Sequence, residues 1–357
     1  MTKRIAIIGA GAAGLTAAWR LRTAPCEIQV FEKSRGYTGR AATRSHGTVR
    51  YDFGANYITG PPERIRQLLT DTLPHDALAT IDPPVWTFDK EGNREPGDPE
   101  SNAAPRWTYA HGINTLGKLL VEEGSLAVQR TTRIHHLTRT NGAWHVHSEQ
   151  GEAQGPFDAV LCTPPAPQTA AILQQSTADA EGEAHLQQCI AALQAATYAP
   201  QFTYVFGLAA PLQRPEPFHA LLNIDRAHPI AWMSIEDDKP SRVPSGQSVV
   251  SAQMSPDWTA ERVDDDPAAY TDTVHALAAD VLGVPLQPLA WTDAHRWRYA
   301  APTESAPGAP LNAAHEVGLY FAGDYRVGKG RVALAMDSGW TQAERIHEAL
   351  GMAISSA

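Results

Sequence analysis

The first residues able to do chemistry are three glycines that could bind the phosphates of a dinucleotide. Gly9, Gly11 and Gly14 follow an apolar run, residues 4–8, with the spacing Gly-x-Gly-x-x-Gly. In this spacing the first glycine permits a tight turn, the second lets the backbone approach a pyrophosphate, and the third lets a helix pack close to a sheet. The amide groups and positive dipole end of that helix would then face the phosphates.

The elements that must hold this glycine loop are a strand, a helix and a second strand. Residues 4–8 are typical of a buried parallel strand, residues 15–21 are apolar, rich in Ala and free of proline, and residues 27–31 return as a strand. Glu32 follows the second strand, where its carboxylate could accept hydrogen bonds from an adenosine ribose. The glycine string alone is weak evidence, since three glycines also make ordinary turns, but here the whole unit is in order.

The choice of dinucleotide stays open at this point. An acidic residue after the second strand would repel a 2′-phosphate on the ribose. However, Lys33 and Arg35 follow Glu32 directly and could pair with such a phosphate.

Length, charge and cysteine content exclude several classes of protein. A chain of 357 residues suggests about two domains, and its net charge of −10 argues against a nucleic-acid or anionic-membrane partner. The cysteines Cys26, Cys162 and Cys189 are far apart and form no Cys-x-x-Cys pair, which fits a reducing cytosol and predicts no zinc site. No run approaches the ~18 apolar residues that would cross a bilayer. We therefore expect a cytoplasmic protein.

Two further segments could lie over a bound dinucleotide. In the cationic loop of residues 33–40, Gly36, Gly39 and Arg40 would let backbone and guanidinium fold over a pyrophosphate. Residues 52–59 place small side chains between aromatic ones. That composition suits a backbone packed against a flat ring.

Four histidines in the middle of the chain invite a metal-site interpretation: His135, His136, His145 and His147. They lie in short β-like stretches, where we expect them on a solvated face. Their spacing fits no coherent ligand set, so we predict no metal site.

The middle of the chain predicts a second domain inserted into the first. A polar helix, residues 63–73, precedes proline-rich sequence. Helical patterns cover residues 168–196 and 267–282, and alternating apolar patterns cover 202–206, 230–234 and 249–252. The predicted fold is α/β, a Rossmann-type nucleotide domain with an inserted domain of antiparallel β-sheet plus helices. We assign residues 1–62, 106–172 and 300–357 to the nucleotide domain, and 63–105 and 173–299 to the substrate domain.

A second glycine-rich strand end lies near the C-terminus. The strand pattern of residues 318–322 ends in Gly323 and Asp324, and a helix begins near Val332. A nicotinamide dehydrogenase would leave this strand end unused, whereas FAD would use both ends. Asp324 could accept hydrogen bonds from the ribityl hydroxyls, unless it only caps an ordinary turn. The helix N-terminus would favour negative charge on a reduced flavin by ~0.3–1 kcal/mol or more.

These residues together resemble the FAD-dependent amine oxidase superfamily, and within it the bacterial renalase-type proteins. The resemblance covers nearly the whole chain, and its more specific parts are residues 295–300 and the block 232–242. It implies the two-domain architecture of amine oxidases and p-hydroxybenzoate hydroxylase, with non-covalent FAD. The sequence departs from the family pattern at Thr38, His111, Ala333 and residues 235–237, which leaves the substrate open.

The resemblance implies hydride transfer from a small donor to flavin N5, with reoxidation by O2 to H2O2. Renalase-type proteins are associated with misreduced dihydro-NAD(P) isomers, and losing a hydride restores an aromatic pyridinium without a general base. A flavin amine oxidase or desaturase, a non-catalytic FAD-binding protein and a flavin-free dehydrogenase are the alternatives. The oligomeric state is not predicted.

The expected site residues fall into two sets. For substrate we expect stacking on Tyr57, Trp232, Trp297 and Tyr299, phosphate or carboxamide contacts from Arg242 and Arg298, and either a hydrogen bond or a structural role from His295. For FAD we expect contacts from Gly9, Ala10, Gly11, Ala12, Ala13, Gly14, Glu32, Lys33, Gly39, Arg40, Gly54, Ala55, Asn56, Tyr57, Ile134, Thr163, Gly323, Asp324, Arg331, Val332 and Ala333.

Overall fold

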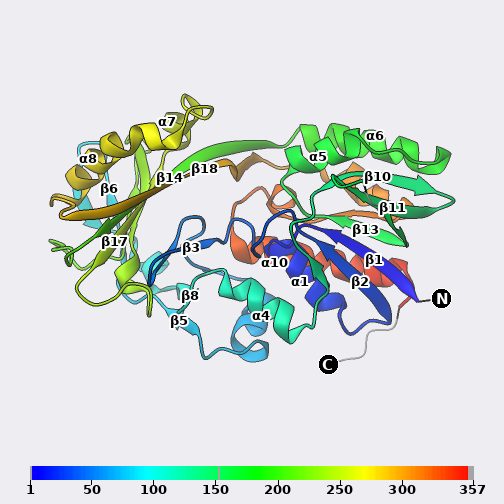
Figure 1. Ribbon diagram of the computed structural model, residues 1–357, viewed down its shortest axis with the longest axis horizontal. Coiled ribbons are helices and arrows are strands. Elements are labelled where there is room, and N and C mark those ends of the chain that lie inside the picture. The colour runs from blue at the N-terminus through cyan, green and yellow to red at the C-terminus, as the bar shows by residue number, and fades with distance from the viewer. Residues whose placement is uncertain (1, 152, 353–357) are drawn as a thin grey trace.

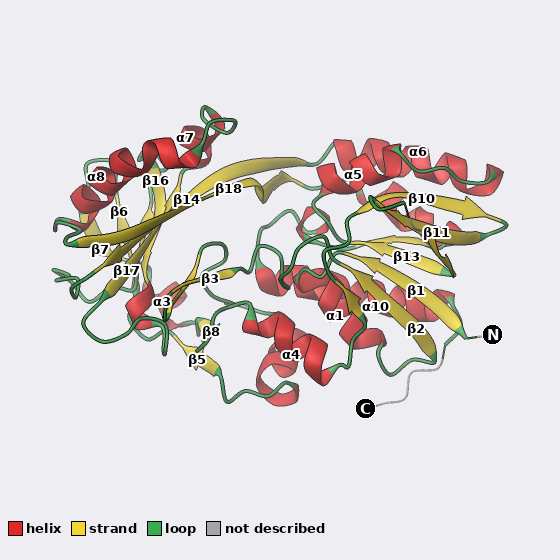
Figure 2. Ribbon diagram, viewed as in Figure 1, coloured by secondary structure: helices red, strands yellow, loops and turns green. Residues whose placement is uncertain are grey.

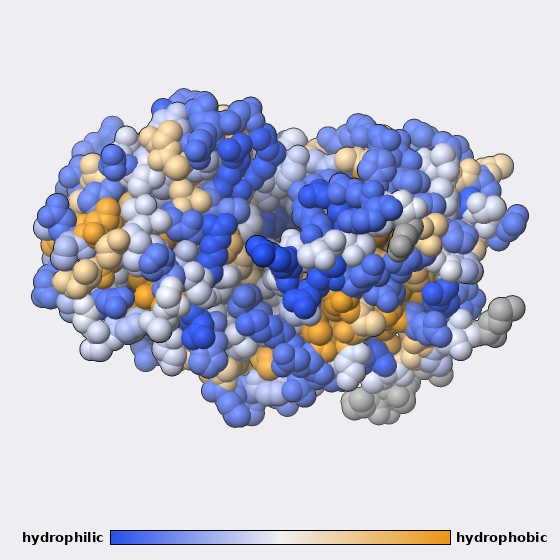
Figure 3. All heavy atoms as spheres, in the orientation of Figure 1, coloured by the Kyte–Doolittle hydropathy of each residue, from blue (hydrophilic) through white to orange (hydrophobic). Residues whose placement is uncertain are grey.

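A computed structural model describes residues 2–151 and 153–352 of the chain. The elements form two lobes, each built around a sheet of its own (Figure 1). The N-terminal strand lies in one lobe, and the helices α7 (Pro256–Ala260) and α8 (Thr271–Leu282) lie on the far side of the other. The space-filling view is hollowed between the lobes (Figure 3).

The first lobe contains a five-stranded parallel sheet with the order β19-β13-β1-β2-β9. Its strands are β1 (Lys3–Ile8), β2 (Cys26–Phe31), β9 (Val128–Gln129), β13 (Ala159–Cys162) and β19 (Leu319–Phe321). The strand–helix–strand unit predicted at the N-terminus is confirmed, with α1 (Ala12–Leu21) directly after the glycine loop.

Two helices cover one face of this sheet. The helices α1 and α10 (Val332–Ala349) pack so closely that a Cβ on Gly339 would lie 2.0 Å from the Ala13 carbonyl oxygen. The helix predicted to begin near Val332 is therefore confirmed, and its packing brings the C-terminal segment against the N-terminal unit. Ile5, Ile7 and Met336 share one apolar core there.

The other face carries a small sheet and two helices. These elements are β10 (Ile134–Thr140), β11 (Ala143–Ser148), β12 (Ala153–Phe157), α5 (Ala166–Gln174) and α6 (Ala180–Gln194). Residues 168–196 were predicted as one helical region, but the structure has two separate helices there, α5 and α6. The chain breaks between the two helices, and the Asp179 side chain accepts a hydrogen bond from the Gly182 amide to cap α6. The His136 and His147 rings stack at 4.2 Å on neighbouring strands.

The second lobe contains a seven-stranded sheet with the order β18-β14-β17-β16-β15-β6-β7. Its strands are β6 (Val85–Phe88), β7 (Arg94–Pro96), β14 (Thr197–Leu208), β15 (Ala220–Asn223), β16 (Ile230–Ile235), β17 (Ser248–Met254) and β18 (Leu289–Glu304). The strands predicted in β14, β16 and β17 are confirmed. The sheet is antiparallel except that β15 and β6 run parallel, which corrects the wholly antiparallel expectation.

Two helices cover the outer face of this sheet (Figure 2). They are α7 (Pro256–Ala260) and α8 (Thr271–Leu282), and α8 buries Val274 and Ala278 against Phe202 and Phe206. The inner face is turned toward the first lobe. Strands β14 and β18 extend beyond the rest of the sheet toward that lobe (Figure 1).

The remaining short elements complete the two lobes. They are β3 (Thr43–His46), β4 (Val49–Asp52), α2 (Glu63–Gln67), β5 (Leu78–Thr80), α3 (Pro99–Ala103), β8 (Trp107–Tyr109), α4 (Thr115–Glu123) and α9 (Gly308–Ala313). The predicted helix over residues 63–73 is α2 continued by one π-helical turn, and its side chains Ile65 and Leu69 join the core of the first lobe. Residues 63–105 thus contribute to both lobes, and the domain boundaries given above stay a prediction.

Within the part of the chain that the structure describes, no helix combines the length and the apolar character needed to cross a bilayer.

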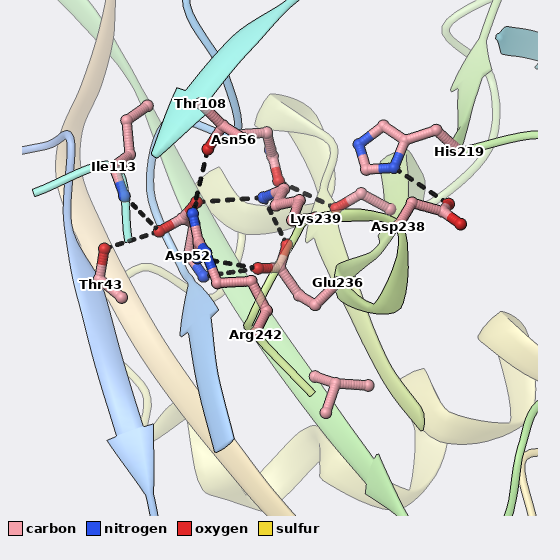
Figure 4. Close-up of polar contacts among 12 residues, drawn as sticks. Thr43, Asp52, Asn56, Thr108, Ile113, His219, Glu236, Asp238, Lys239 and Arg242 are labelled. Carbon is pink, nitrogen blue, oxygen red and sulfur yellow. Dashed lines mark hydrogen bonds and ion pairs between the residues drawn. The ribbon is translucent and has the colours of Figure 1, made fainter. Parts of the chain in front are cut away.

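Four charged side chains without exposed surface join β4 to the segment that follows β16 (Figure 4). The Lys239 ammonium lies 2.6 Å from Glu236 Oε1 and 3.1 Å from Asp52 Oδ2, and the Arg242 guanidinium lies 2.9 Å from the same Asp52 oxygen. Burial alone would raise the pKa of Asp52, but the charges of Lys239 and Arg242 outweigh it and hold the pKa low. Two cations and two carboxylates therefore balance in the interior.

Removing Lys239 should destabilise the fold strongly, because the remaining buried charges would no longer balance. We expect Lys239→Met to lower the free energy of unfolding by about 3–5 kcal/mol. As a control, Lys3→Met breaks a partly exposed ion pair with Asp158 and should cost less than about 1 kcal/mol. Urea denaturation measures both, and equal losses in the two variants would refute the balanced network.

Candidate active site

The glycine loop is closely packed beneath and open above. Gly9 has a φ of +100°, and a Cβ on Gly14 would lie 2.0 Å from the Gly9 carbonyl oxygen. In contrast, a Cβ on Gly11 would meet no atom within 4 Å. The first turn of α1 has no side-chain cap and no acidic residue, so Ala12 and Ala13 begin a helix with free amide groups. This cradle fits a pyrophosphate.

Glu32 lies beside this loop at the end of β2. Its carboxylate accepts a hydrogen bond from the Ala10 amide at 2.8 Å and another from the Ser34 amide at 2.7 Å. These two bonds fix the carboxylate while leaving lone pairs for a ribose hydroxyl. The neighbouring Lys33 ammonium donates instead to Gln168 at 3.0 Å.

Two residues that we expected to contact the cofactor turn their side chains toward the protein instead. The Thr163 hydroxyl donates to the Ile8 carbonyl at 2.8 Å, and a Cβ on Gly9 would lie 2.6 Å from that hydroxyl. Ile134 points its side chain into the apolar core, which leaves only its backbone for a ligand.

Arg40 joins the N-terminal loops to the C-terminal strand end. Its guanidinium donates to Asp324 at 2.6 Å and to the Tyr299 carbonyl at 3.0 Å, while the Tyr198 hydroxyl donates to the other Asp324 oxygen at 2.9 Å. Asp324 follows Gly323, whose φ of +133° turns the chain after β19. Arg40, expected over a pyrophosphate, therefore orients the carboxylate expected to bind the ribityl chain.

Two further segments expected to contact the cofactor are the loop at Gly39 and the start of α10. Gly39 lies against the glycine loop, since its Cβ would be 3.6 Å from the Gly11 Cα. At the C-terminal end, α10 begins with Val332 and Ala333 after the exposed Arg331, with no side-chain cap and no acid in its first turn. Its free amide groups can face a partial negative charge such as the pyrimidine edge of a flavin.

Residues 53–57, called the strip below, lie between the two lobes. On one side the Ala55 amide donates to the Arg40 carbonyl at 2.9 Å, and a Cβ on Gly54 would lie 2.0 Å from that same oxygen. Only a glycine can therefore occupy this position. The close approach explains why the sequence places its smallest residues here.

The other side of the strip is held by the second sheet. The Phe53 carbonyl accepts from Trp297 Nε1 at 2.9 Å, and the Gly54 carbonyl accepts from the Gln253 amide at 2.6 Å. Ser234 donates to the Asn56 side chain at 2.9 Å. Each donor comes from a different strand of that sheet.

Tyr57 ends the strip among aromatic side chains. Its ring lies 5.9 Å from the Trp232 ring and 6.5 Å from the His219 ring. Within the described residues, the buried Trp232 Nε1 has no hydrogen-bond partner. Burial raises the pKa of the Tyr57 phenol against the opposing charges of Arg106 and Arg331, so the phenol stays protonated at neutral pH.

The two histidines nearest this region are neutral at neutral pH. Burial lowers the pKa of His219, although its Nδ1 lies 3.3 Å from the Asp238 carboxylate. Burial also lowers the pKa of His295 to about 4, helped by the nearby Arg44 guanidinium. Arg44 donates to His295 Nδ1 at 3.1 Å, so this ring nitrogen accepts and carries no proton.

The residues expected to bind substrate separate into different places. Trp297 stacks on Phe53 at 5.2 Å, and Tyr299 packs edge-on against Tyr198 at 5.7 Å. Arg298 is exposed and pairs with Asp264, whereas Arg242 belongs to the buried charge network. Neither guanidinium joins the group formed by Tyr57 and Trp232.

Several residues that hold this region were not found from the sequence. They are Arg44, Tyr198, His219, Ser234 and Gln253. One signal was available, because Gln253 and Ser234 interrupt strands that otherwise read as apolar. A polar side chain on a buried strand needs a partner, and here that partner is the strip.

The two glycines with opposite surroundings provide a test of the cradle. Gly11→Ala should leave the stability of the apoprotein nearly unchanged but weaken dinucleotide binding by at least about tenfold, because the methyl enters ligand space. Gly14→Ala should lower the free energy of unfolding by about 3 kcal/mol or more, because its methyl would enter the Gly9 backbone. Thermal unfolding and FAD titration measure the two effects, and undiminished binding by Gly11→Ala would contradict the cradle.

Comparison with known proteins agrees with this geometry. The profile of an NAD(P)-binding Rossmann-like domain matches residues 7–72, and the profile of flavin-containing amine oxidoreductases matches residues 99–347. The second match covers more than half of the chain.

Solved structures of similar fold cover almost the whole chain at low sequence identity. A protein from Exiguobacterium sp. 255-15, described as a protoporphyrinogen oxidase, aligns with a TM-score of 0.76 and 16% identity over 98% of this chain and 99% of its own. Reduced UDP-galactopyranose mutase aligns with a TM-score of 0.73 and 13% identity over 98% of this chain and 94% of its own. A variant of putrescine oxidase aligns with a TM-score of 0.71 and 12% identity over 97% of this chain and 99% of its own.

The glycine cradle, the second strand end at Asp324 and the profile match lead to one assignment. The chain belongs to the family of flavin-containing amine oxidoreductases and is an FAD-dependent oxidoreductase.

Proposed function

We propose that this enzyme is renalase-like: it oxidises misreduced dihydro-NAD(P) isomers by hydride transfer, with O2 as the final acceptor and H2O2 as product. Support comes from the sequence resemblance and from the character of the groups around Tyr57. The proposal concerns the donor and the acceptor, which the family assignment leaves open.

The observation that carries the proposal is the weakness of the bases beside the aromatic pair among the described residues, where His219 Nε2 has no hydrogen-bond partner but belongs to a ring whose pKa is lowered. His219 and His295 both have lowered pKa values, and each has one ring nitrogen engaged by a charged neighbour. The Tyr57 phenol is protonated because its pKa is raised. A dihydropyridine needs no base, since loss of a hydride alone restores an aromatic ring.

The cofactor roles follow from the geometry and belong to the proposal. The amides after Gly11 would hold the pyrophosphate, Glu32 the adenosine ribose and Asp324 the ribityl hydroxyls. The strip would pack against the isoalloxazine, and the start of α10 would face its pyrimidine edge. When bound, FAD supplies the hydride acceptor and passes the electrons to O2.

The donor would lie against Tyr57 and Trp232. The Trp232 Nε1–H, which lacks a partner within the described residues, is a donor suited to a carboxamide oxygen. Arg331 takes the place that we expected for Arg242 and Arg298 as the cation for a phosphate. It is exposed, forms no ion pair within the described residues, and its charge reaches the Tyr57 phenol.

Amine oxidation is the second candidate, because the matching profile is that of amine oxidoreductases. An amine must lose its proton before it can give up a hydride. That requirement separates the two candidates experimentally. A desaturase or a non-catalytic FAD-binding protein would differ in reacting with other donors or with none.

The donor class is tested by mixing the yellow enzyme with candidate donors without oxygen. We expect dihydro-NAD(P) isomers to bleach the flavin absorbance faster than any amine, because the site offers stacking and a free cation rather than a strong base. Stopped-flow absorbance measures the rates. Faster reduction by amines would refute the donor assignment, and inertness to every donor would favour a non-catalytic protein.

The pH dependence of flavin reduction gives an independent test. Because burial lowers the pKa of His295 to about 4, lowers that of His219 and raises that of the Tyr57 phenol, the rate with a dihydronicotinamide should be flat from about pH 6 to about pH 9. An amine donor would instead react faster as the pH rises toward its own pKa of about 10. A rate that changes tenfold per pH unit within this window would contradict a base-free reaction.

A further inference from the structure

The strip receives hydrogen bonds from three of four neighbouring strands in the second sheet. The donors are Trp297 on β18, Gln253 on β17 and Ser234 on β16. The strand β14 lies between β18 and β17 and gives none, although its Thr203 is directly opposite Gln253. The inner face of this sheet therefore supports the strip at separate points.

The hydrogen bond from Gln253 differs from the other two because it fixes the orientation of a peptide group, the one between Gly54 and Ala55. It reaches the Gly54 carbonyl at 2.6 Å, while the Ala55 amide of the same peptide group donates to the Arg40 carbonyl at 2.9 Å. The two bonds hold opposite edges of one peptide plane. A glycine otherwise has wide freedom to rotate its peptide groups, so the orientation of this plane depends on both bonds.

We propose that Gln253 is a positioning residue for the reaction: its amide sets the orientation of the Gly54 peptide, against which the isoalloxazine packs. The inference rests on the proposed placement of FAD along the strip. It assigns a role to a residue of the substrate-side sheet that acts on the flavin through the strip. The substrate lobe thereby becomes part of the flavin environment.

The surroundings of Gln253 make the bond costly to lose. Gln253 is 8% exposed, so removing its amide would leave the Gly54 carbonyl without its donor. Thr203 and Ser251 lie on the same face and are buried, but their hydroxyls have no partner within the described residues. Replacing either hydroxyl removes no hydrogen bond, which makes these two residues matched controls.

The first test compares Gln253→Leu with Thr203→Val in the FAD-bound enzyme. We expect Gln253→Leu to shift the visible flavin spectrum and to slow flavin reduction by about tenfold at saturating donor, with little change in KM. Thr203→Val should match the unaltered enzyme in spectrum and rate. A spectrum and rate for Gln253→Leu equal to those of Thr203→Val would overturn the inference.

The second test uses Gln253→Glu, which keeps the shape and makes the donor depend on pH. A carboxylate cannot donate to the Gly54 carbonyl, whereas a protonated carboxyl can, and burial would raise the pKa of such a carboxyl. We therefore expect the spectrum of Gln253→Glu to return toward that of the unaltered enzyme as the pH falls. A role in packing alone would give no such recovery.

The charged and titratable groups around this position define the control. They are Tyr57 at the end of the strip, His295 and Asp293 on β18, and Arg44 opposite them. All remain in the unaltered enzyme, so its spectrum over the same pH range is the reference. A spectrum of Gln253→Glu that follows the reference at every pH, or that never recovers, would refute the role.

These measurements do not depend on the identity of the donor. The spectrum needs only bound FAD, and chemical reduction replaces the donor if no dihydronicotinamide reacts. Failure of the donor proposal therefore leaves the Gln253 test intact. If Gln253→Leu does not fold, the pH-dependent spectrum of Gln253→Glu alone decides the inference.

Discussion

The structure depends on how the chain from Asp52 to Tyr57 is held between the two lobes. Asp52 is anchored in the interior by Lys239 and Arg242, and Gly54 lies against the Arg40 carbonyl on one side and Gln253 on the other. Burying these charges is tolerable only because two cations meet two carboxylates. The same contacts that close the core therefore set the backbone beside the proposed flavin ring, so stability and cofactor geometry share one set of residues.

The sequence predicted those parts of the fold whose signal is local. The N-terminal strand–helix–strand unit was predicted correctly because Gly9, Gly11 and Gly14 indicate a turn between an apolar strand segment and an apolar helix segment. The strand β18 was missed because Leu289–Glu304 is charged, mostly half-buried and without clear alternation. Arg242 was expected at the substrate because the local sequence does not reveal that its guanidinium is buried in an ion pair. Its partner Asp52 lies far away in sequence. Partners brought together by tertiary packing leave no mark in the local pattern.

The fold alone does not identify the substrate. Proteins described as an oxidase and as a mutase align with this chain over nearly its whole length at 12–16% identity. The discriminating features are side chains: a Trp232 Nε1 without a partner in the described residues, two neutral histidines and an exposed Arg331 near Tyr57. On these features we base the proposal of a planar donor that carries an anionic group and needs no strong base.

A crystal structure of the enzyme with FAD bound would test the central claim most directly. The claim is that one flavin dinucleotide extends from the glycine loop to the start of α10 with its ring against the strip. We predict phosphate oxygens within hydrogen-bond distance of the amides after Gly11, and the isoalloxazine in contact with Gly54 and Ala55. A ring that lies away from these two residues, or a Gly54 carbonyl that leaves Gln253 on binding, would contradict the account.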